Sequence, residues 1–154
     1  SKRYYHDVVG CNSRLDAIQA AILNIKLKHL DEYIAARRKA AGFYDRAFAD
    51  NKSITVPFRD GNNKHVFHQY TLLLHGVDRD GLHKFLADEG VPSMIYYPVP
   101  AHRQKMFDAF GGSDYQLPVT DWLTERVISL PIHTELDEEQ QQFIVDKVLA
   151  FLNK

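Results

Sequence analysis

Helical periodicity runs through a long stretch of this chain, from about Ser13 to Ala49. The first part repeats an apolar residue at three- and four-residue steps, which forms one face of a helix: Leu15, Ile18, Ile22 and Ile25. Ser13, with Asp16 three residues later, resembles a capping box that would begin it. The second part starts at Asp31, a suitable N-cap, and its face comprises Tyr33, Arg37, Ala40, Ala41, Tyr44 and Phe48. The pattern predicts two helices or one long kinked helix.

The second part also carries charged residues between its apolar positions. Arg37, Arg38, Lys39, Asp45 and Arg46 are the charged side chains of this region. An amphipathic helix turns such residues toward water. We therefore expect the opposite side of this helix to be solvated.

The periodicity changes to an alternating one at His65–Leu74, which predicts a β-strand. In such a strand, His68 and Tyr70 share one face. Strand patterns recur at Ser93–Val99 and at Val127–Ile132. The three segments predict a small, mainly antiparallel sheet.

Short helices separate these strands. Asp78, Thr120 and Asp137 are each suited to cap a helix, and Gly90 is suited to end the first of them. The order is helix, strand, helix, strand, short helix, strand, helix. This order predicts an α+β fold in which helices cover a three-stranded sheet.

Composition excludes several classes of protein. The chain has 154 residues, of which 45% are hydrophobic and 25% charged, so it can bury a core without metals or disulfides. A net charge of −1 argues against nucleic-acid binding. One cysteine, Cys11, excludes an intramolecular disulfide. Without a long apolar run or a signal peptide, we expect a cytoplasmic protein with no membrane partner.

Eight histidines raise the question of a metal site. His65 and His68 lie three apart on the predicted strand, so they point to opposite faces. His102 and His133 lie in other segments. This spacing does not match that of a metal site, and we expect none.

Three groups of residues are candidates for binding, each with a simpler structural interpretation. His68 and Tyr70 offer hydrogen-bonding groups for a sugar or phosphate, or are half-buried strand residues. Tyr96 and His102, around a proline-rich turn, either line a cleft or pack at a strand edge. The segment Gly10–Arg14 either holds a phosphate at a helix N-terminus or caps that helix.

Several motifs of the chain, in order, resemble the DegT/StrS family of pyridoxal-phosphate-dependent nucleotide-sugar aminotransferases. The first runs from Tyr5-His6 through Gly10-Cys11-Asn12-Ser13-Arg14-Leu15-Asp16-Ala17-Ile18-Gln19-Ala20-Ala21. The others are Lys26-Leu27, Leu30-Asp31, Arg37, His65-Val66-Phe67-His68-Gln69-Tyr70, Ile95-Tyr96-Tyr97-Pro98 with Pro100 and His102, and Ser129-Leu130-Pro131-Ile132-His133. The resemblance covers nearly the whole chain, with one departure at Ala101, where relatives often carry a larger aliphatic residue.

The resemblance implies the carboxy-terminal part of a fold-type-I aminotransferase. Residues 1–30 would be a remnant of the large cofactor domain, and residues 31–154 the small domain with its long interdomain helix. The family's lysine that holds the cofactor lies upstream of the matched region, and none of the ten lysines here occupies its motif. We therefore expect no catalytic residue in this chain, no activity from it alone, and no pyridoxal phosphate bound by it alone. The opening at Ser1, without an obvious first element, fits a piece of a longer protein.

The resemblance also implies partners and residue roles. The whole enzyme would move an amino group from glutamate to a nucleotide-linked keto-sugar, as a homodimer. Asn12 would reach the phosphate of pyridoxal phosphate in the partner subunit, and Arg14 would meet the sugar-nucleotide diphosphate. The residues that would line or support the sugar side are His68, Tyr70, Tyr96 and His102.

Two other interpretations remain open from the sequence. The chain could be a free-standing regulatory or sugar-phosphate-binding α+β module. It could also be a self-associating piece, since the apolar faces of Ser13–Leu30 would be bare without a large domain. We expect the isolated chain to form a dimer or a higher oligomer.

Overall fold

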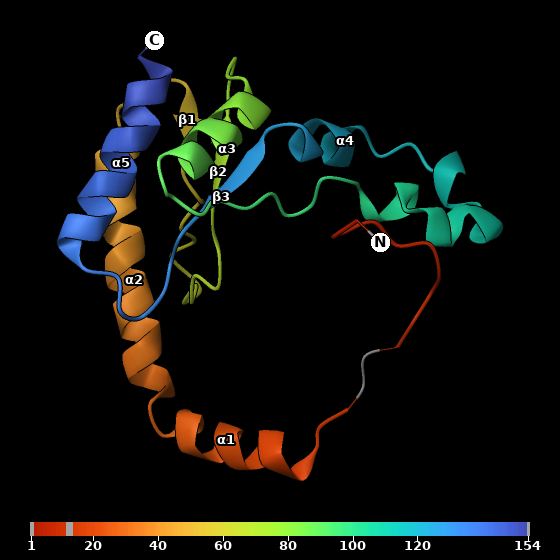
Figure 1. Cartoon of the computed structure of the whole chain (residues 1–154), viewed down its shortest axis with the longest axis horizontal. Helices are drawn as coiled ribbons and strands as arrows, with labels where there is room; N and C mark the ends of the chain where they lie inside the picture. Colours follow the sequence, from red (N-terminus) through yellow and green to blue (C-terminus); the bar gives the residue numbers. More distant parts are fainter. Residues whose placement is uncertain (1, 12–13, 154) are drawn as a thin grey trace.

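The computed structural model describes residues 2–11 and 14–153 (Figure 1). Its sheet has three strands in the order β1-β2-β3: β1 (Ile54–Thr55), β2 (Tyr70–Leu74) and β3 (Val127–Leu130). Both pairings are antiparallel, with Ile54 opposite Leu74 and Tyr70 opposite Leu130. The α+β fold with a small three-stranded antiparallel sheet is confirmed.

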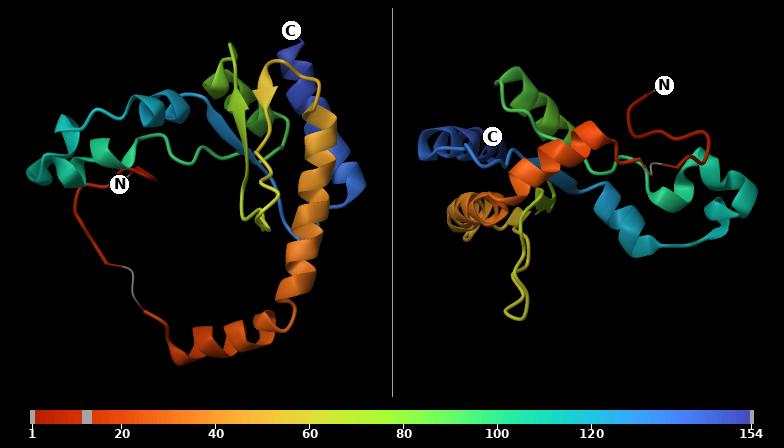
Figure 2. Two further views of the ribbon diagram at one scale, coloured as in Figure 1. Left: turned by 180° about the vertical axis from the view of Figure 1, so that it is seen from behind. Right: turned by 90° about the horizontal axis from the view of Figure 1, so that it is seen from below.

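Three helices pack with this sheet around one core: α2 (Leu30–Phe48), α3 (Arg79–Asp88) and α5 (Glu138–Leu152). Helices α2 and α5 lie side by side in both views of Figure 2, and the buried Gln141 side chain donates a hydrogen bond of 2.9 Å to the Ala40 carbonyl between them. The side chains at the centre are aromatic and aliphatic: Tyr44, Phe48, Leu72, Ile128 and Val148. The predicted inner face of α2 is confirmed at Ala40, Ala41, Tyr44 and Phe48.

Local signals set two helix starts and one helix end. The Asp78 carboxylate accepts a hydrogen bond from the Gly81 amide at the start of α3. Asp137 and Gln140 form a reciprocal capping box at the start of α5. Gly90 follows α3 with a φ of +78°, a conformation that glycine adopts without steric cost. These three predictions are confirmed.

Two strand predictions are wrong in extent. Strand β2 begins at Tyr70 rather than at His65, and Phe67, which lies between them, has a φ of +49°, outside the β region. Of Ser93–Val99, only Met94 forms a bridge, to Ser129. Prolines on both sides of this segment lack the amide that a strand ladder needs. The third strand of the sheet is instead β1, in a segment that the sequence pattern did not predict as a strand.

Helix α1 (Ala17–Leu27) is separate from α2, so the prediction of two helices is the one that holds. Asp16 caps α1 in a capping box with Gln19, whereas the predicted cap Ser13 lies outside the described residues. Helix α2 starts after His29, and Asp31 lies within its first turn rather than at its cap. Figures 1 and 2 show α1 apart from the sheet, and none of its residues is buried.

Residues 101–124 extend away from the sheet as an arm of short helices (Figure 1). The arm contains three 3-10 helices and α4 (Pro118–Thr124); the 3-10 helices span Ala101–Arg103, Lys105–Phe110 and Gly112–Asp114. Helix α4 starts with Pro118 in its first turn, so Thr120 lies inside this helix instead of capping it. None of the helices that the structure describes is long and apolar enough to cross a membrane.

Candidate functional site

His68 and Tyr96 come together at a small hollow beside β3. Both residues line a volume of about 150 Å³, together with neighbouring residues of the β3 edge such as Ser129 and Pro131. Apart from His68, the described side chains that line this hollow carry no ionisable acid or amine, and the Ser129 hydroxyl pairs with that of Thr71 at 2.8 Å. Drug-sized ligands occupy pockets of about 300–1,000 Å³, so this hollow holds only part of such a ligand. Its chemistry suits uncharged hydroxyl groups.

A larger hollow of about 720 Å³, which His68 also lines, is formed by residues of α1 and α2 together with Val66 and Thr134. Its apolar wall comprises Leu23, Leu27, Leu30, Ile34 and Val66. Lys26 and Arg37 also line it, and no carboxylate does among the residues that the structure describes. His68 therefore lines both hollows, of which the larger also carries the cationic groups of Lys26 and Arg37.

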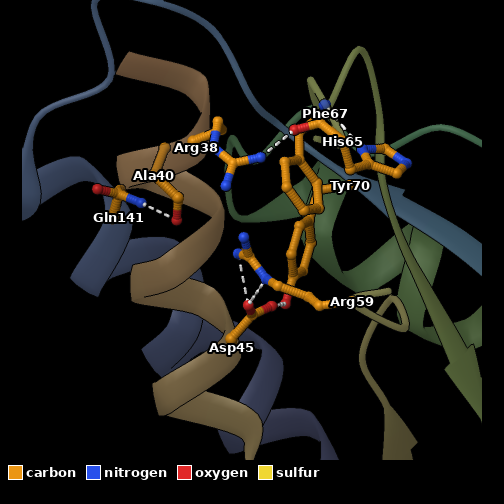
Figure 3. A network of polar contacts seen from close by, with 8 residues as sticks. All are labelled: Arg38, Ala40, Asp45, Arg59, His65, Phe67, Tyr70 and Gln141. Carbon is orange, nitrogen blue, oxygen red and sulfur yellow. Dashed lines mark hydrogen bonds and ion pairs between the residues drawn. The ribbon is translucent and has the colours of Figure 1, made fainter. Parts of the chain in front are cut away.

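Arg37 holds the backbone around His68 in place. Its Nη1 atom donates to the carbonyl oxygens of Phe67, His68 and Ile132 at 3.1, 3.2 and 3.0 Å. Arg38 donates to the His65 carbonyl at 2.8 Å (Figure 3). A guanidinium that binds several carbonyl oxygens fixes a loop whose backbone forms no strand hydrogen bonds, such as the loop before β2. The prediction that this side of α2 is merely solvated is therefore wrong at Arg37 and Arg38.

Tyr70 belongs to the core and does not face either hollow. Its hydroxyl donates to Asp45 Oδ1 at 2.7 Å, and Arg59 binds the other oxygen of that carboxylate (Figure 3). Burial, reinforced by the hydrogen bond to Asp45 and its charge, raises the pKa of the Tyr70 phenol. His68 and Tyr70, which the sequence placed on one face, therefore lie in different surroundings. Tyr70 is a buried strand residue whose hydroxyl is hydrogen-bonded, and Asp45, which was expected to face solvent, is its partner.

His102 lies in the arm, away from the hollow that His68 and Tyr96 share. Its side chain is 8% exposed, and its Nε2 atom lies 3.5 Å from Asp121 Oδ1 without the geometry of a hydrogen bond. Asp121 itself accepts two hydrogen bonds from Arg103, and this pairing lowers the pKa of its carboxyl. The local contacts of His102 are those of a packed residue in the arm.

The predicted phosphate contacts lie at the start of the chain. Asn12 lies outside the described residues, and Arg14 is exposed in the segment before α1. The Asp16 carboxylate accepts the Gln19 amide at the N-terminus of α1. The N-terminus of α1 is thus capped by an anion of the chain itself, Asp16, which lies outside the segment Gly10–Arg14.

The larger hollow, as its described lining residues form it, is not a complete site for pyridoxal phosphate. Such a site gathers a lysine amine, a carboxylate for the ring nitrogen and donors for the phosphate. Lys26 lines the larger hollow, but no acidic partner lines it with Lys26. Likewise, no group of three or more metal-ligating side chains occurs within residues 2–11 and 14–153.

The sequence-based search missed Arg37 as a clamp, Lys26 as a lining residue, and Gln104, a buried side chain of the arm. Arg37 had a signal, since it lies on the packed face of α2 yet is charged. Gln104 had none, because its partners lie about a hundred positions away, at the start of the chain.

The chain belongs to the DegT/DnrJ/EryC1/StrS aminotransferase family, whose sequence profile matches residues 1–149. It is 42% identical over 151 residues to a protein named pleiotropic regulatory protein from Geobacillus stearothermophilus, covering 97% of this chain and 40% of that protein. It is 44% identical over 137 residues to UDP-N-acetyl-3-dehydro-alpha-D-glucosamine 3-aminotransferase of Acidithiobacillus ferrooxidans, covering 89% of this chain and 36% of that enzyme.

A solved structure of the same family supports the fold. The crystal structure of a DegT/DnrJ/EryC1/StrS aminotransferase from Brucella abortus matches with a TM-score of 0.79 and 36% identity, over 99% of this chain and 40% of that one. The chain therefore spans about 40% of the length of the relatives it matches. Aminotransferases of this family use pyridoxal phosphate.

Proposed function

We propose that this chain is the carboxy-terminal part of an aminotransferase that transfers an amino group from glutamate to a nucleotide-linked keto-sugar. The observation that carries the proposal is the family match over residues 1–149, joined to a span of about 40% of the relatives' length. The relatives include a named nucleotide-sugar aminotransferase at 44% identity. In this proposal the chain is inactive alone and works in a homodimer together with a large domain.

Within that enzyme, the residues of this chain bind and orient the cofactor phosphate and the sugar nucleotide. Asn12 reaches the cofactor phosphate of the partner subunit, and Arg14 meets the diphosphate of the sugar nucleotide. His68 and Tyr96 hydrogen-bond hydroxyl groups of the sugar, which the lining of their shared hollow supports. The cofactor, when bound, supplies the electron sink for the transferred amino group.

In this proposal, Tyr70 and His102 do not contact the sugar but support residues that do. Tyr70 is fully buried and hydrogen-bonded to Asp45, so it supports the strand that follows His68. His102 packs against Asp121 in the arm, beyond the turn that carries Tyr96. Both are positioning residues rather than ligands for the sugar.

Reductive trapping tests whether the chain holds the cofactor by itself. The chain is incubated with pyridoxal phosphate, reduced with borohydride, and analysed by intact mass and peptide mapping. We expect scattered, substoichiometric adducts on exposed lysines, because the described residues offer no acidic partner for a ring nitrogen beside Lys26. A single stoichiometric adduct at one lysine would mean that a complete cofactor site exists in this chain and would overturn the proposal.

A regulatory or sugar-phosphate-binding module is the second candidate. It is favoured by one observation, the 42% identity to a protein named pleiotropic regulatory protein. A free-standing module must bind its ligand without another domain. Calorimetric titration of the chain with UDP-N-acetylglucosamine distinguishes the two candidates. The module is supported by saturable binding that becomes weaker in His68→Ala but not in Gln116→Ala, a change at an exposed position. The enzyme part is supported if no heat of binding is measured.

A further inference from the structure

Residues near the start of the chain dock onto its arm, about a hundred positions away. The buried side chain of Gln104 makes two of the contacts: Nε2 donates to the Tyr4 carbonyl at 2.8 Å, and Oε1 accepts from the His6 amide at 3.0 Å. The Met106 amide donates to the His6 carbonyl at 3.0 Å. Lys105 and Asp7 form an exposed ion pair at 3.2 Å. We name Tyr4–Asp7 the strap.

The aromatic end of the strap adds side-chain contacts. The Tyr4 ring lies edge-on to the rings of Tyr96 and Tyr97, with centroids 5.7 and 5.3 Å away. Such edge-to-face pairs attract through their ring quadrupoles. Tyr4 also has a φ of +68°, which a bulky residue adopts only when its surroundings impose it. The docking contacts supply such surroundings.

The hydrogen-bonding groups of the buried Gln104 side chain are satisfied only when the strap is docked. Its side chain is buried, with the residue 6% exposed, and both ends of its amide have their strongest contacts with strap backbone. Its other contact, to the Val99 carbonyl, is 3.5 Å long. A buried amide that loses its partners is costly, because it is cut off from water as well.

The strap joins two segments that lie about a hundred positions apart in the sequence. Figure 1 shows the start of the chain beside the arm, while α1 lies at the opposite end of the molecule. From α1 the chain returns to the sheet through α2. The strap therefore connects the segment that leads toward Asn12 with the arm that follows Tyr96.

We propose that the strap is a conformational latch: Gln104 and Tyr4 fasten Tyr4–Asp7 to the arm and hold Tyr96 in place beside the hollow it shares with His68. The latch rests on contacts within this chain and stands independently of the proposed function. If the proposed function holds as well, the latch couples the cofactor-side segment to the sugar-side residues.

Hydrogen exchange of single amides, measured by NMR on the 154-residue chain, tests the latch. The Met106 amide is the reporter, since its partner is the His6 carbonyl of the strap. We expect Gln104→Ala to accelerate its exchange about tenfold, the scale set by losing a few hydrogen bonds. Gln116→Ala, the same change at an exposed position of the arm, is the matched control and leaves it unaltered.

A second variant guards against local misfolding of the arm. Tyr4→Ala changes a strap residue and leaves every residue of the arm unaltered, and the amides of Val91 and Ser129, bonded to the Leu86 and Met94 carbonyls, report on the rest of the fold. The latch is supported if Tyr4→Ala also accelerates exchange at Met106 while these two reference amides keep their rates. It is overturned if the Met106 amide exchanges at the same rate in the unaltered chain and in Tyr4→Ala. Neither result depends on cofactor binding, so the proposed function is tested separately.

Discussion

Helices α1 and α2 follow each other in the chain but use their apolar residues in opposite ways. Helix α2 buries Ala41, Tyr44 and Phe48 almost completely and turns its charges to loops and solvent. Helix α1 is the more apolar of the two, yet Ile18 is 75% exposed and Leu27 67% exposed. A helix that is apolar around most of its surface needs cover on more than one side. Apolar side chains favour burial, but the position of neighbouring elements determines whether they are buried.

The contrast predicts very different costs for truncating one side chain in each helix. Phe48→Ala should lower the free energy of unfolding by about 3–5 kcal/mol, because Phe48 is fully packed in the core. Ile22→Ala, on exposed α1, should change it by no more than about 0.5 kcal/mol. Urea unfolding of both variants measures the difference. Equal losses would mean that α1 packs against the core in solution.

Exposed α1 also predicts self-association of the chain. Light scattering at high concentration should give the mass of a dimer or a higher oligomer, since apolar surface is removed from water on association. Ile22→Glu places a charge on that surface and should weaken association about a hundredfold. A clean monomer of the unaltered chain across the concentration range would contradict this prediction.

The two helices α1 and α5 begin with the same capping box, which allows a matched comparison. Asp137→Ala should destabilise the fold by about 1 kcal/mol, because α5 contributes to the core. Asp16→Ala should reduce helicity at α1 but leave the main unfolding transition in place. Circular dichroism and urea midpoints report the two effects, and an equal shift in midpoint would show that α1 unfolds with the core.

The last prediction concerns the buried Tyr70 phenol and an effect that appears at alkaline pH. Burial and Asp45 raise its pKa in the folded state above the ordinary value of 10.0. The unfolded chain therefore loses this proton first, and stability falls as pH rises above about 10. Tyr70→Phe should remove this part of the alkaline loss, while costing about 0.5–1.5 kcal/mol near neutral pH for the lost hydrogen bond.

Unfolding curves at pH 8 and at pH 11 test the prediction for Tyr70. Tyr97→Phe provides the control, because it removes a phenol hydroxyl from an exposed side chain outside the core. An alkaline loss of the same size in Tyr70→Phe and in the unaltered chain would assign it to other groups, such as Tyr44, whose pKa burial also raises.

Local sequence was sufficient for much of the fold. Asp78 and Asp137 each cap a helix through an amide three residues away, so the contact lies within a few positions of chain. The inner face of α2 follows from a period that one helix imposes on its own residues. The family resemblance, carried by motifs in order, agrees with the profile match over residues 1–149.

The arrangement of the candidate site depends on contacts that no local pattern contains. His68 and Tyr70 were expected on one face of a strand, but β2 begins at Tyr70, and His68 lies in the irregular segment after the left-handed Phe67. Arg37 joins carbonyls 30 to 95 positions away, and Gln104 joins residues 98 and 100 positions away. Helix caps and helix faces depend on residues that are close together in the sequence, so they can be predicted from the sequence. Clamps, hollows and the latch exist only when distant segments meet, and packing places them.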